Sequence, residues 1–575
     1  MVLEPVHKIP YPEESLPTYT FGSHDGPLDN ERPVFVNAED DSASYTFAQY
    51  RLYSQRFAAG LRKAGLKDGD RLLLYSGNNL YFPAVLMGTI MAGGVFTGAN
   101  PTYVAREVAY QLDNSGAKYF LANRASFEVA LEAAKEAGVA EENVYVFDSD
   151  TQGQGIGDFK HWSELLESES VGKKFKWDDC RGEGENQKVI ALNYSSGTTG
   201  RAKGVMISHR NYVSNCELVR FLNTRRTPTD FERQYGESWL CFLPMYHAMA
   251  QTYFCVNAPR SGAKIVVMPR FDFKQMLKNI EKYRITMVMI VPPIVVMLTK
   301  DPDVRAGKYD LSSVTDFGSG AAPLAKETIR ELEKIWNKQT GTTRYLKNGW
   351  GMTEGTCTLI VVDPGNPRPP EGVGEPGPNV YLKFMNDAGT EEVKLGEPGE
   401  LWVKAPNVMM GYWRNEEATA ETLTKDGWLK TGDVGQYING FVHIVDRRKA
   451  SSPSVVRSIA NGFQELIKVK GNQVAPAELE ALLLEHPAVQ DAGVIGVPYQ
   501  DDEAPRAYVV LVEGQKASAE DIAAFISKKV TPTKRLTGGI RFIDQIPKNP
   551  SGKILRKFLR EKAKEEAEGQ PKSRL

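Results

Sequence analysis

The sequence predicts an α/β fold built on buried, largely parallel strands. Short apolar runs at 263–271, 285–293 and 313–323 alternate with helical patterns such as the one at 326–339. That alternation is typical of parallel sheets covered by helices. From about Gly372 to Val403 the pattern changes to short strands separated by Gly and Pro, which predicts a small β-rich section.

After Val445 a shorter α/β segment begins, and we expect two domains, 1–445 and 446–575. The second domain contains a helix that starts at Pro476. Proline is favoured in a first turn, where its missing N–H costs nothing. The helical spacing places Leu479, Leu482 and Leu483 on one face. The apolar runs that follow complete a small α/β unit.

Composition excludes several classes of protein. The 575 residues are 41% hydrophobic and 25% charged, as in ordinary globular proteins. The net charge of −2 offers no general basic field, so we expect no nucleic-acid partner. Five scattered cysteines without CxxC or metal spacing are typical of a reduced intracellular protein. The most apolar stretch, 285–298, is short and contains two prolines, so no transmembrane segment is expected.

The two ends of the sequence bear on location. The first residues contain no apolar core of a secretory signal. The last three, Ser-Arg-Leu, are a close variant of the Ser-Lys-Leu peroxisomal address. We therefore expect a peroxisomal import receptor as a partner and a peroxisomal location; the alternative is an ordinary charged tail on a cytoplasmic protein.

A loop suited to phosphate follows an apolar strand pattern. The string YSSGTTGRAKGV, from Tyr194 to Val205, combines hydroxyls, glycines and one lysine. Glycines let the backbone approach a polyphosphate, amides and hydroxyls donate to its oxygens, and the lysine adds charge. The spacing is not that of a Walker A loop. The alternative, a flexible Ser/Gly turn, fits this ordered string poorly.

This loop and seven further motifs resemble the adenylate-forming superfamily of acyl-CoA synthetases, 4-coumarate–CoA ligases, beetle luciferases and peptide-synthetase adenylation domains. The motifs follow the family's order over nearly the whole chain and look most like 4-coumarate–CoA ligases. The resemblance implies a large N-terminal domain of doubly wound sheets with a small β-barrel-like section, and a small mobile α/β C-terminal domain. The seven are PMYHAMAQ (244–251), GSGAAPL (318–324), NGWGMTE (348–354), GWLKTGDVG (427–435), VDRRK (445–449), ELIKVKGNQVAPAELE (465–480) and PKNPSGKILRK (547–557).

The implied reaction joins a carboxylic acid to coenzyme A through an acyl-AMP formed from ATP. Thr353 matches a phosphate contact and Glu354 the Mg²⁺ ligand, consistent with the preference of Mg²⁺ for oxygen donors. Trp350 stands where many members have Tyr and can stack on adenine. Asp433 matches the residue that binds the ribose hydroxyls, and Arg447 matches the arginine on the same side of the ribose. The implied nucleotide- and CoA-binding residues are Ser195, Ser196, Gly197, Thr198, Thr199, Gly200, Lys203, Gly320, Ala321, Ala322, Pro323, Asn348, Gly349, Trp350, Gly351, Met352, Thr353, Asp433, Arg447, Lys470 and Gly471.

The same resemblance implies three catalytic residues. Lys553 matches the lysine that bridges carboxylate and phosphate during adenylation, where its charge meets developing negative charge. Lys468 matches the residue used after the C-terminal domain has turned for thioester formation, beside a strand that lines the pantetheine tunnel. His247 matches a histidine thought to gate carboxylate entry; the alternative is a packed core histidine.

The acid itself is less defined. The candidates for its pocket mix aromatic and small groups, which favours an aryl or phenylpropanoid acid, with a medium-chain fatty acid as the alternative. A luciferase-like oxygenase would share every motif. A peptide-synthetase adenylation domain is disfavoured because a carrier domain would not fit after Lys553, and a catalytically dead nucleotide-binding protein because the matched positions are filled. The pocket candidates are Tyr246, Met249, Ala250, Tyr253, Gly318, Ser319 and Gly349.

One segment interrupts the family pattern. Without residues 450–464, VDRRK would join ELIKVKG in the family's usual unbroken run. The segment lies beside Lys449, which matches the pivot of domain rotation, and its Ser and Pro content predicts disorder. We favour a retained in-frame intron over a tolerated surface loop, because hinges depend on a few residues that absorb the backbone change.

Overall fold

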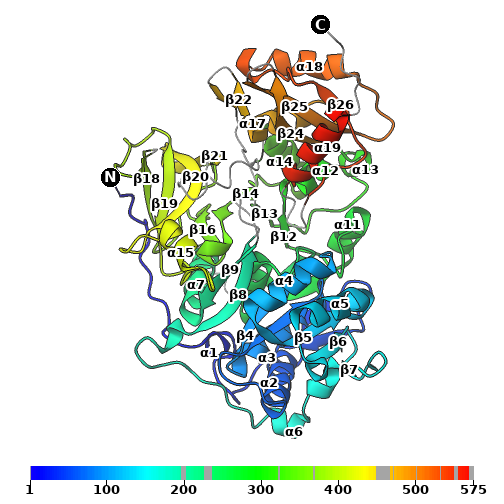
Figure 1. Cartoon of the computed structure of the whole chain (residues 1–575), viewed down its shortest axis with the longest axis vertical. Coiled ribbons are helices and arrows are strands. Elements are labelled where there is room, and N and C mark those ends of the chain that lie inside the picture. Colours follow the sequence, from blue (N-terminus) through cyan, green and yellow to red (C-terminus); the bar gives the residue numbers. More distant parts are fainter. Residues whose placement is uncertain are drawn as a thin grey trace.

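The computed structural model describes residues 2–195, 202–225, 236–320, 324, 326–366, 369–386, 388–447, 467–469, 472–474, 476–499, 502–530, 532–548 and 554–568. Figure 1 shows two sheets with helices in the blue to green part of the chain, smaller yellow sheets beside them, and an orange to red C-terminal part at the top. None of the described helices is long and apolar enough to cross a membrane. The longer helices are α2 (Phe47–Lys63), α3 (Phe82–Met91), α4 (Ala105–Ser115), α5 (Phe127–Ala137), α7 (His209–Thr224), α11 (Phe273–Lys282), α12 (Pro292–Lys300) and α14 (Lys326–Thr340).

The first sheet has seven strands in the order β7-β6-β5-β3-β4-β8-β9. Its neighbours are parallel except β8 and β9, which are antiparallel. The strands are β3 (Arg71–Tyr75), β4 (Val95–Ala99), β5 (Ala117–Asn123), β6 (Val144–Phe147), β7 (Lys160–His161), β8 (Val189–Ser195) and β9 (Lys203–Ser208).

Alternate residues of β3 are buried on opposite faces of this sheet. Leu72 and Leu74 belong to the large core that includes residues of α2 and α3. Leu73 and Tyr75 belong to a separate core with residues of α4 and α5. Successive side chains of a strand point to opposite faces, so helices cover both sides and the strand reads as one apolar run. The doubly wound arrangement is confirmed.

The second sheet also has seven strands, in the order β14-β13-β12-β10-β11-β1-β2. Three of the predicted apolar runs form its strands β11, β12 and β13, which lie in parallel pairs, and the predicted helix at 326–339 is α14. The strands are β1 (Pro33–Asn37), β2 (Ser44–Thr46), β10 (Ser238–Cys241), β11 (Lys264–Val267), β12 (Met287–Ile290), β13 (Asp316–Ser319) and β14 (Lys347–Asn348).

The β-rich section forms two antiparallel sheets, with the orders β15-β16-β17 and β18-β19-β20-β21. Over the described strands both sheets are open, so the β-barrel-like expectation needs correction: four strands form an open sheet with two edges, not a closed barrel. β21 continues to Arg447, past the boundary placed after residue 445. The strands are β15 (Trp350–Gly351), β16 (Thr358–Val361), β17 (Glu375–Pro376), β18 (Tyr381–Met385), β19 (Gly399–Lys404), β20 (Leu429–Ile438) and β21 (Phe441–Arg447).

The C-terminal part has its own core. In the predicted helix α17, Leu479 and Leu483 are fully buried and Leu482 packs against them, as the spacing indicates. α12 of the larger part contacts β24, and Lys300 at its end donates to the carbonyls of His486 and Val489. The elements are β22 (Ile467–Val469), β23 (Asn472–Val474), α17 (Pro476–Leu484), β24 (Val489–Tyr499), β25 (Asp502–Leu511), α18 (Ala519–Ser527), β26 (Ile540–Phe542) and α19 (Arg556–Glu568).

Candidate active site

A cavity of about 720 Å³ lies where the larger part meets the C-terminal part. Its walls combine strand ends of the larger part with helix and loop residues of the smaller one. Ligands of α/β proteins bind outside the carboxyl ends of parallel strands, and β14 ends here at Asn348. The polar and aromatic groups of the wall include Asn348, Trp350, Asp433, Glu480, Asp491, Lys548 and Arg556.

Trp350 and Asp433 are joined within this cavity. The indole Nε1–H of Trp350 donates to Asp433 Oδ2 at 3.0 Å. Trp350 belongs to β15 and Asp433 to β20, so the bond links two different sheets. Both side chains are half-buried. An aromatic face and a carboxylate that line one cavity suit a base and a sugar, as the sequence predicts.

Glu354 is the most enclosed of the predicted site carboxylates, with 7% of its surface exposed. Its Oε1 accepts hydrogen bonds from Ser195 Oγ and from the hydroxyl of Tyr412, both at 2.9 Å. Ser195 ends β8, and Glu354 lies in the short turn after β15. The structure thus brings together the start of the phosphate loop and the predicted metal ligand, which lie 159 positions apart.

Tyr412 is a residue of the candidate site that the sequence did not predict. The residue lies in no recognised motif, yet its ring also carries the ammonium of Lys203 at 4.9 Å from the centroid. An isolated β-bridge between Val205 and Tyr412 holds the two segments together. Tyr412 therefore contacts two predicted phosphate-site residues. The pairing of β9 with this distant segment is what places Tyr412 beside the predicted phosphate loop.

His247 is half-buried, with its ring 4.6 Å from that of Tyr246. Within the described part of the chain, its Nε2 atom has no hydrogen-bond partner. Burial lowers the pKa of His247 to about 4, so the imidazole is neutral at physiological pH. A π-helical turn, Gln251–Asn257, follows soon after, and such turns are frequent at functional sites.

The predicted adenine-side residues meet at the ends of β13 and β14. The amide of Gly349 donates to the carbonyl of Ser319 at 2.9 Å, and a Cβ on Gly320 would lie 3.4 Å from the Gly349 carbonyl. Asn348 donates through Nδ2 to the Gly372 carbonyl, while its Oδ1 has no partner among the residues described. A buried, unpartnered amide oxygen in a cavity wall is a ready acceptor for a ligand N–H.

The acyl-pocket candidates are packed rather than exposed. The hydroxyl of Tyr253 lies 3.1 Å from Thr358 Oγ1. Gly318 faces Met289, whose Sδ would lie 2.5 Å from an added Cβ. Tyr246 and Ala250 are buried, and Met249 packs against the main core. These positions combine two phenol rings with a glycine that makes room for Met289.

Two further predicted residues are placed by the register of their strands. The β20–β21 register sets Arg447 opposite Asp433, and Lys468 lies in β22 opposite Gln473. Gly351 and Met352 follow Trp350 in the cavity wall, and Thr353 begins the short turn after them. Ten nucleotide- and CoA-site residues, one catalytic lysine, the insert and the C-terminal tripeptide lie outside the described residues: Ser196, Gly197, Thr198, Thr199, Gly200, Ala321, Ala322, Pro323, Lys470, Gly471, Lys553, 450–464 and 573–575.

The chain on both sides of residues 549–553 is well anchored. Lys548 pairs with Ile554 in an isolated bridge. Its ammonium contacts both oxygens of Asp491 at 2.7 and 2.6 Å, and Arg556 binds Glu480 through two hydrogen bonds of 2.8 and 2.6 Å. These ion pairs line the cavity and fasten the ends of the segment that contains Lys553 to α17 and β24.

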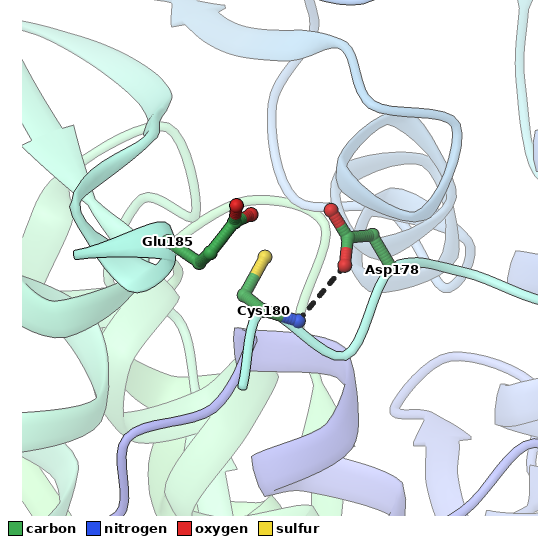
Figure 2. A group of neighbouring side chains, drawn as sticks. All are labelled: Asp178, Cys180 and Glu185. Atoms are coloured by element: carbon green, nitrogen blue, oxygen red, sulfur yellow. Dashed lines mark hydrogen bonds between the residues drawn. The ribbon is translucent and has the colours of Figure 1, made fainter. Parts of the chain in front are cut away.

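A second group of possible ligand atoms lies elsewhere, at Asp178, Cys180 and Glu185 (Figure 2). Lys188 already contacts the carboxylates of Asp178 and Glu185 at 2.9 and 2.5 Å. Burial raises the pKa of the Cys180 thiol to about 12, so it stays protonated and is a poor ligand. We interpret the group as an ion-pair network and assign it no metal.

Comparison with known proteins identifies the family. The AMP-binding enzyme model matches residues 27–413, and the AMP-binding enzyme C-terminal domain model matches 478–553. A phenylacetyl-CoA ligase (epaB) of Aspergillus niger is 32% identical over 93% of this chain and 94% of its own. Peroxisomal OPC-8:0-CoA ligase 1 of Arabidopsis thaliana is 34% identical over 95% and 93%.

Solved structures agree with this assignment. ATP-bound MatB from Rhodopseudomonas palustris is 26% identical and superposes with a TM-score of 0.76, covering 96% of this chain and 99% of its own. The family models together span most of the sequence, and the relatives match it almost from end to end. The chain therefore belongs to the AMP-binding enzyme family and is an AMP-forming acid–CoA ligase.

Proposed function

We propose that this ligase activates an aryl or phenylpropanoid acid, and that the cavity bounded by Trp350, Asp433 and Asn348 is its ATP site. The observation that carries the proposal is the indole–carboxylate pair in the wall of that cavity. A flat ring and an adjacent acceptor match the two parts of a nucleoside, the base and the sugar hydroxyls.

Several residues of the site have a role in holding the nucleotide. The face of Trp350 stacks on adenine, and the unpartnered Oδ1 of Asn348 accepts from its exocyclic amine. Asp433 accepts from the ribose hydroxyls, with Arg447 on the same side. Gly320 and Gly349 have no side chains, so the backbone at the ends of β13 and β14 comes close to the base.

The phosphates extend toward Glu354 and Lys203. One buried carboxylate, held by two hydroxyls, fits Mg²⁺, which is usually bound by one or two carboxylates together with substrate phosphates. Glu354 would hold the ion, which would neutralise phosphate charge. Lys203, Ser195 and Thr353 then orient the chain of phosphates for attack by the acid on the α-phosphorus, with pyrophosphate leaving in line.

The acid enters beside His247. A neutral imidazole has one N–H and one acceptor nitrogen, so it can donate to a carboxylate without trapping it in a strong ion pair. The phenol rings of Tyr246 and Tyr253 favour a flat aryl group, and the relative that is named a phenylacetyl-CoA ligase supports the same class. A medium-chain fatty acid is the alternative.

The second half-reaction uses the C-terminal domain, residues 446–575, after it has rotated about a hinge near Lys449. Lys553 serves adenylation and Lys468 serves thioester formation, in which the CoA sulfur attacks the acyl carbon and AMP leaves. Lys470 and Gly471 border the pantetheine tunnel. The ion pairs of Lys548 and Arg556 support this role, because they hold the described residues on either side of Lys553 to α17 and β24.

A pyrophosphate-release screen over a panel of acids, with and without CoA, tests the substrate. We expect turnover with cinnamic, coumaric or phenylacetic acids and thioester product only when CoA is present. A kcat/KM that is highest for octanoate and other medium-chain acids would instead support the chain-acid alternative. Product that carries no CoA when CoA is supplied would support a stand-alone adenylating or luciferase-like enzyme.

The C-terminal Ser-Arg-Leu supports a peroxisomal location through an import receptor, as does the relative that is named peroxisomal. A fluorescent reporter that ends in the last ten residues of this chain should collect in peroxisomes. Removal of Leu575 should disperse it. Diffuse fluorescence from the intact tail would contradict the proposal and favour the cytoplasm.

A further inference from the structure

We propose that Trp350 is a positioning residue for ribose recognition: its indole N–H holds the Asp433 carboxylate, so that stacking on the base and binding of the ribose hydroxyls act as one unit. The inference rests on the proposed nucleotide site and extends it. It concerns a bond that only tryptophan makes at this position, between residues 83 apart in the sequence.

The backbone of Asp433 is already fixed where the carboxylate begins. Its amide donates to Thr431 Oγ1 at 3.1 Å, and that hydroxyl donates to the Leu401 carbonyl at 2.6 Å, on the neighbouring strand β19. These backbone bonds do not by themselves set the side-chain torsions of Asp433. The bond from Trp350 to Oδ2 adds a restraint on those torsions and helps to set the orientation of the carboxylate.

The backbone of Trp350 is also fixed, by strand pairing. It lies in β15, opposite Ile360 of β16 in an antiparallel pair. Its ring is half-buried and lines the cavity, so one surface remains for a ligand while the edge donates to Asp433. A carboxylate has about four acceptor positions over its two oxygens, so a bond from the indole is compatible with bonds from a ribose.

The bond is specific to tryptophan. Phenylalanine offers a stacking face but no donor, and tyrosine carries its only donor at the tip of the ring rather than at its edge. A hydrogen bond to a charged group is worth about tenfold or more in an equilibrium constant. Loss of the indole N–H should therefore act on the ribose contacts, beyond any loss of stacking.

The test compares binding of AMP, 2′-deoxy-AMP and 3′-deoxy-AMP to the full chain by isothermal titration calorimetry. We expect the unaltered protein to prefer AMP over at least one deoxy analogue, and Trp350→Phe to reduce that preference by about tenfold. Trp402→Phe is the matched control. It makes the same change of ring in β19, outside the cavity wall, and should leave the preference unchanged.

A double-mutant cycle tests the coupling itself. In Asp433→Ala the preference for the ribose hydroxyls should already be lost, and adding Trp350→Phe should not change it further, because the two residues act through one bond. If Trp350→Phe weakens AMP and both deoxy analogues by the same factor, the residue is a stacking platform only and the inference is overturned.

Two other results separate this inference from the proposed function. If the unaltered protein binds no AMP, the nucleotide site itself is misplaced, and both fail. If it binds AMP and Asp433→Ala leaves the ribose preference intact, Asp433 does not bind the ribose hydroxyls. The inference then fails, while the proposed adenylation reaction stands. Thermal unfolding of each variant shows that the comparison concerns folded protein.

Discussion

Tyr412→Phe removes one hydroxyl from the proposed phosphate site and leaves the ring in place. The lost bond, 2.9 Å long, ends on Glu354 Oε1, and both residues are only 7% exposed. A hydrogen bond to a charged acceptor is worth about 1.5–3 kcal/mol, and each 1.4 kcal/mol is about tenfold. We expect kcat/KM in ATP–pyrophosphate exchange to fall about ten- to a hundredfold, with a raised requirement for Mg²⁺.

Tyr412→Leu separates the two functions of this residue. Loss of the ring also removes the contact with Lys203, a cation–π interaction worth about 0.5–1 kcal/mol, so exchange should fall about two- to fivefold further. Tyr119→Phe is the control, since its hydroxyl donates to the Ala64 carbonyl, away from the proposed site. Exchange by folded Tyr412→Phe within twofold of the unaltered protein would refute the reasoning.

Three further predictions follow from the same structure. Lys553→Ala should slow acyl-AMP formation by about 10²–10³ and spare thioester formation from supplied acyl-AMP, while Lys468→Ala shows the opposite bias; equal loss of both steps would contradict the two-state proposal. Burial lowers the pKa of Lys300 to about 8, whereas a lysine in the unfolded chain has its ordinary pKa near 10.4. Between these pH values the unfolded chain binds more protons, so the melting temperature should rise with pH over that window relative to Lys300→Met. Parallel melting-temperature profiles of the two proteins would contradict this. Deletion of 450–464 should preserve both half-reactions, as assays of the shortened chain would show, whereas loss of thioester formation would make the segment a working part of the hinge.

The sequence predicted the features that depend on local order. The apolar runs at 263–271 and 285–293 became β11 and β12, and the spacing of Leu479 and Leu483 located the buried face of α17. Such patterns are readable because strand and helix periods repeat over a few residues. The expectation of a β-barrel-like section was wrong, because the described sheets there are open. Short strands with Gly and Pro turns are common to open sheets and barrels alike.

The candidate site also combines residues that the sequence predicted with partners that only the tertiary structure shows. Motifs predicted Ser195, Glu354 and Asp433 singly, because each lies in a short recognisable string. The partners of these residues came from the tertiary structure alone: Tyr412 joins Glu354 from 58 positions away, and Trp350 reaches Asp433 across two sheets. Side-chain bonds between distant strands depend on how the sheets are placed in space. No local period of the sequence encodes that placement.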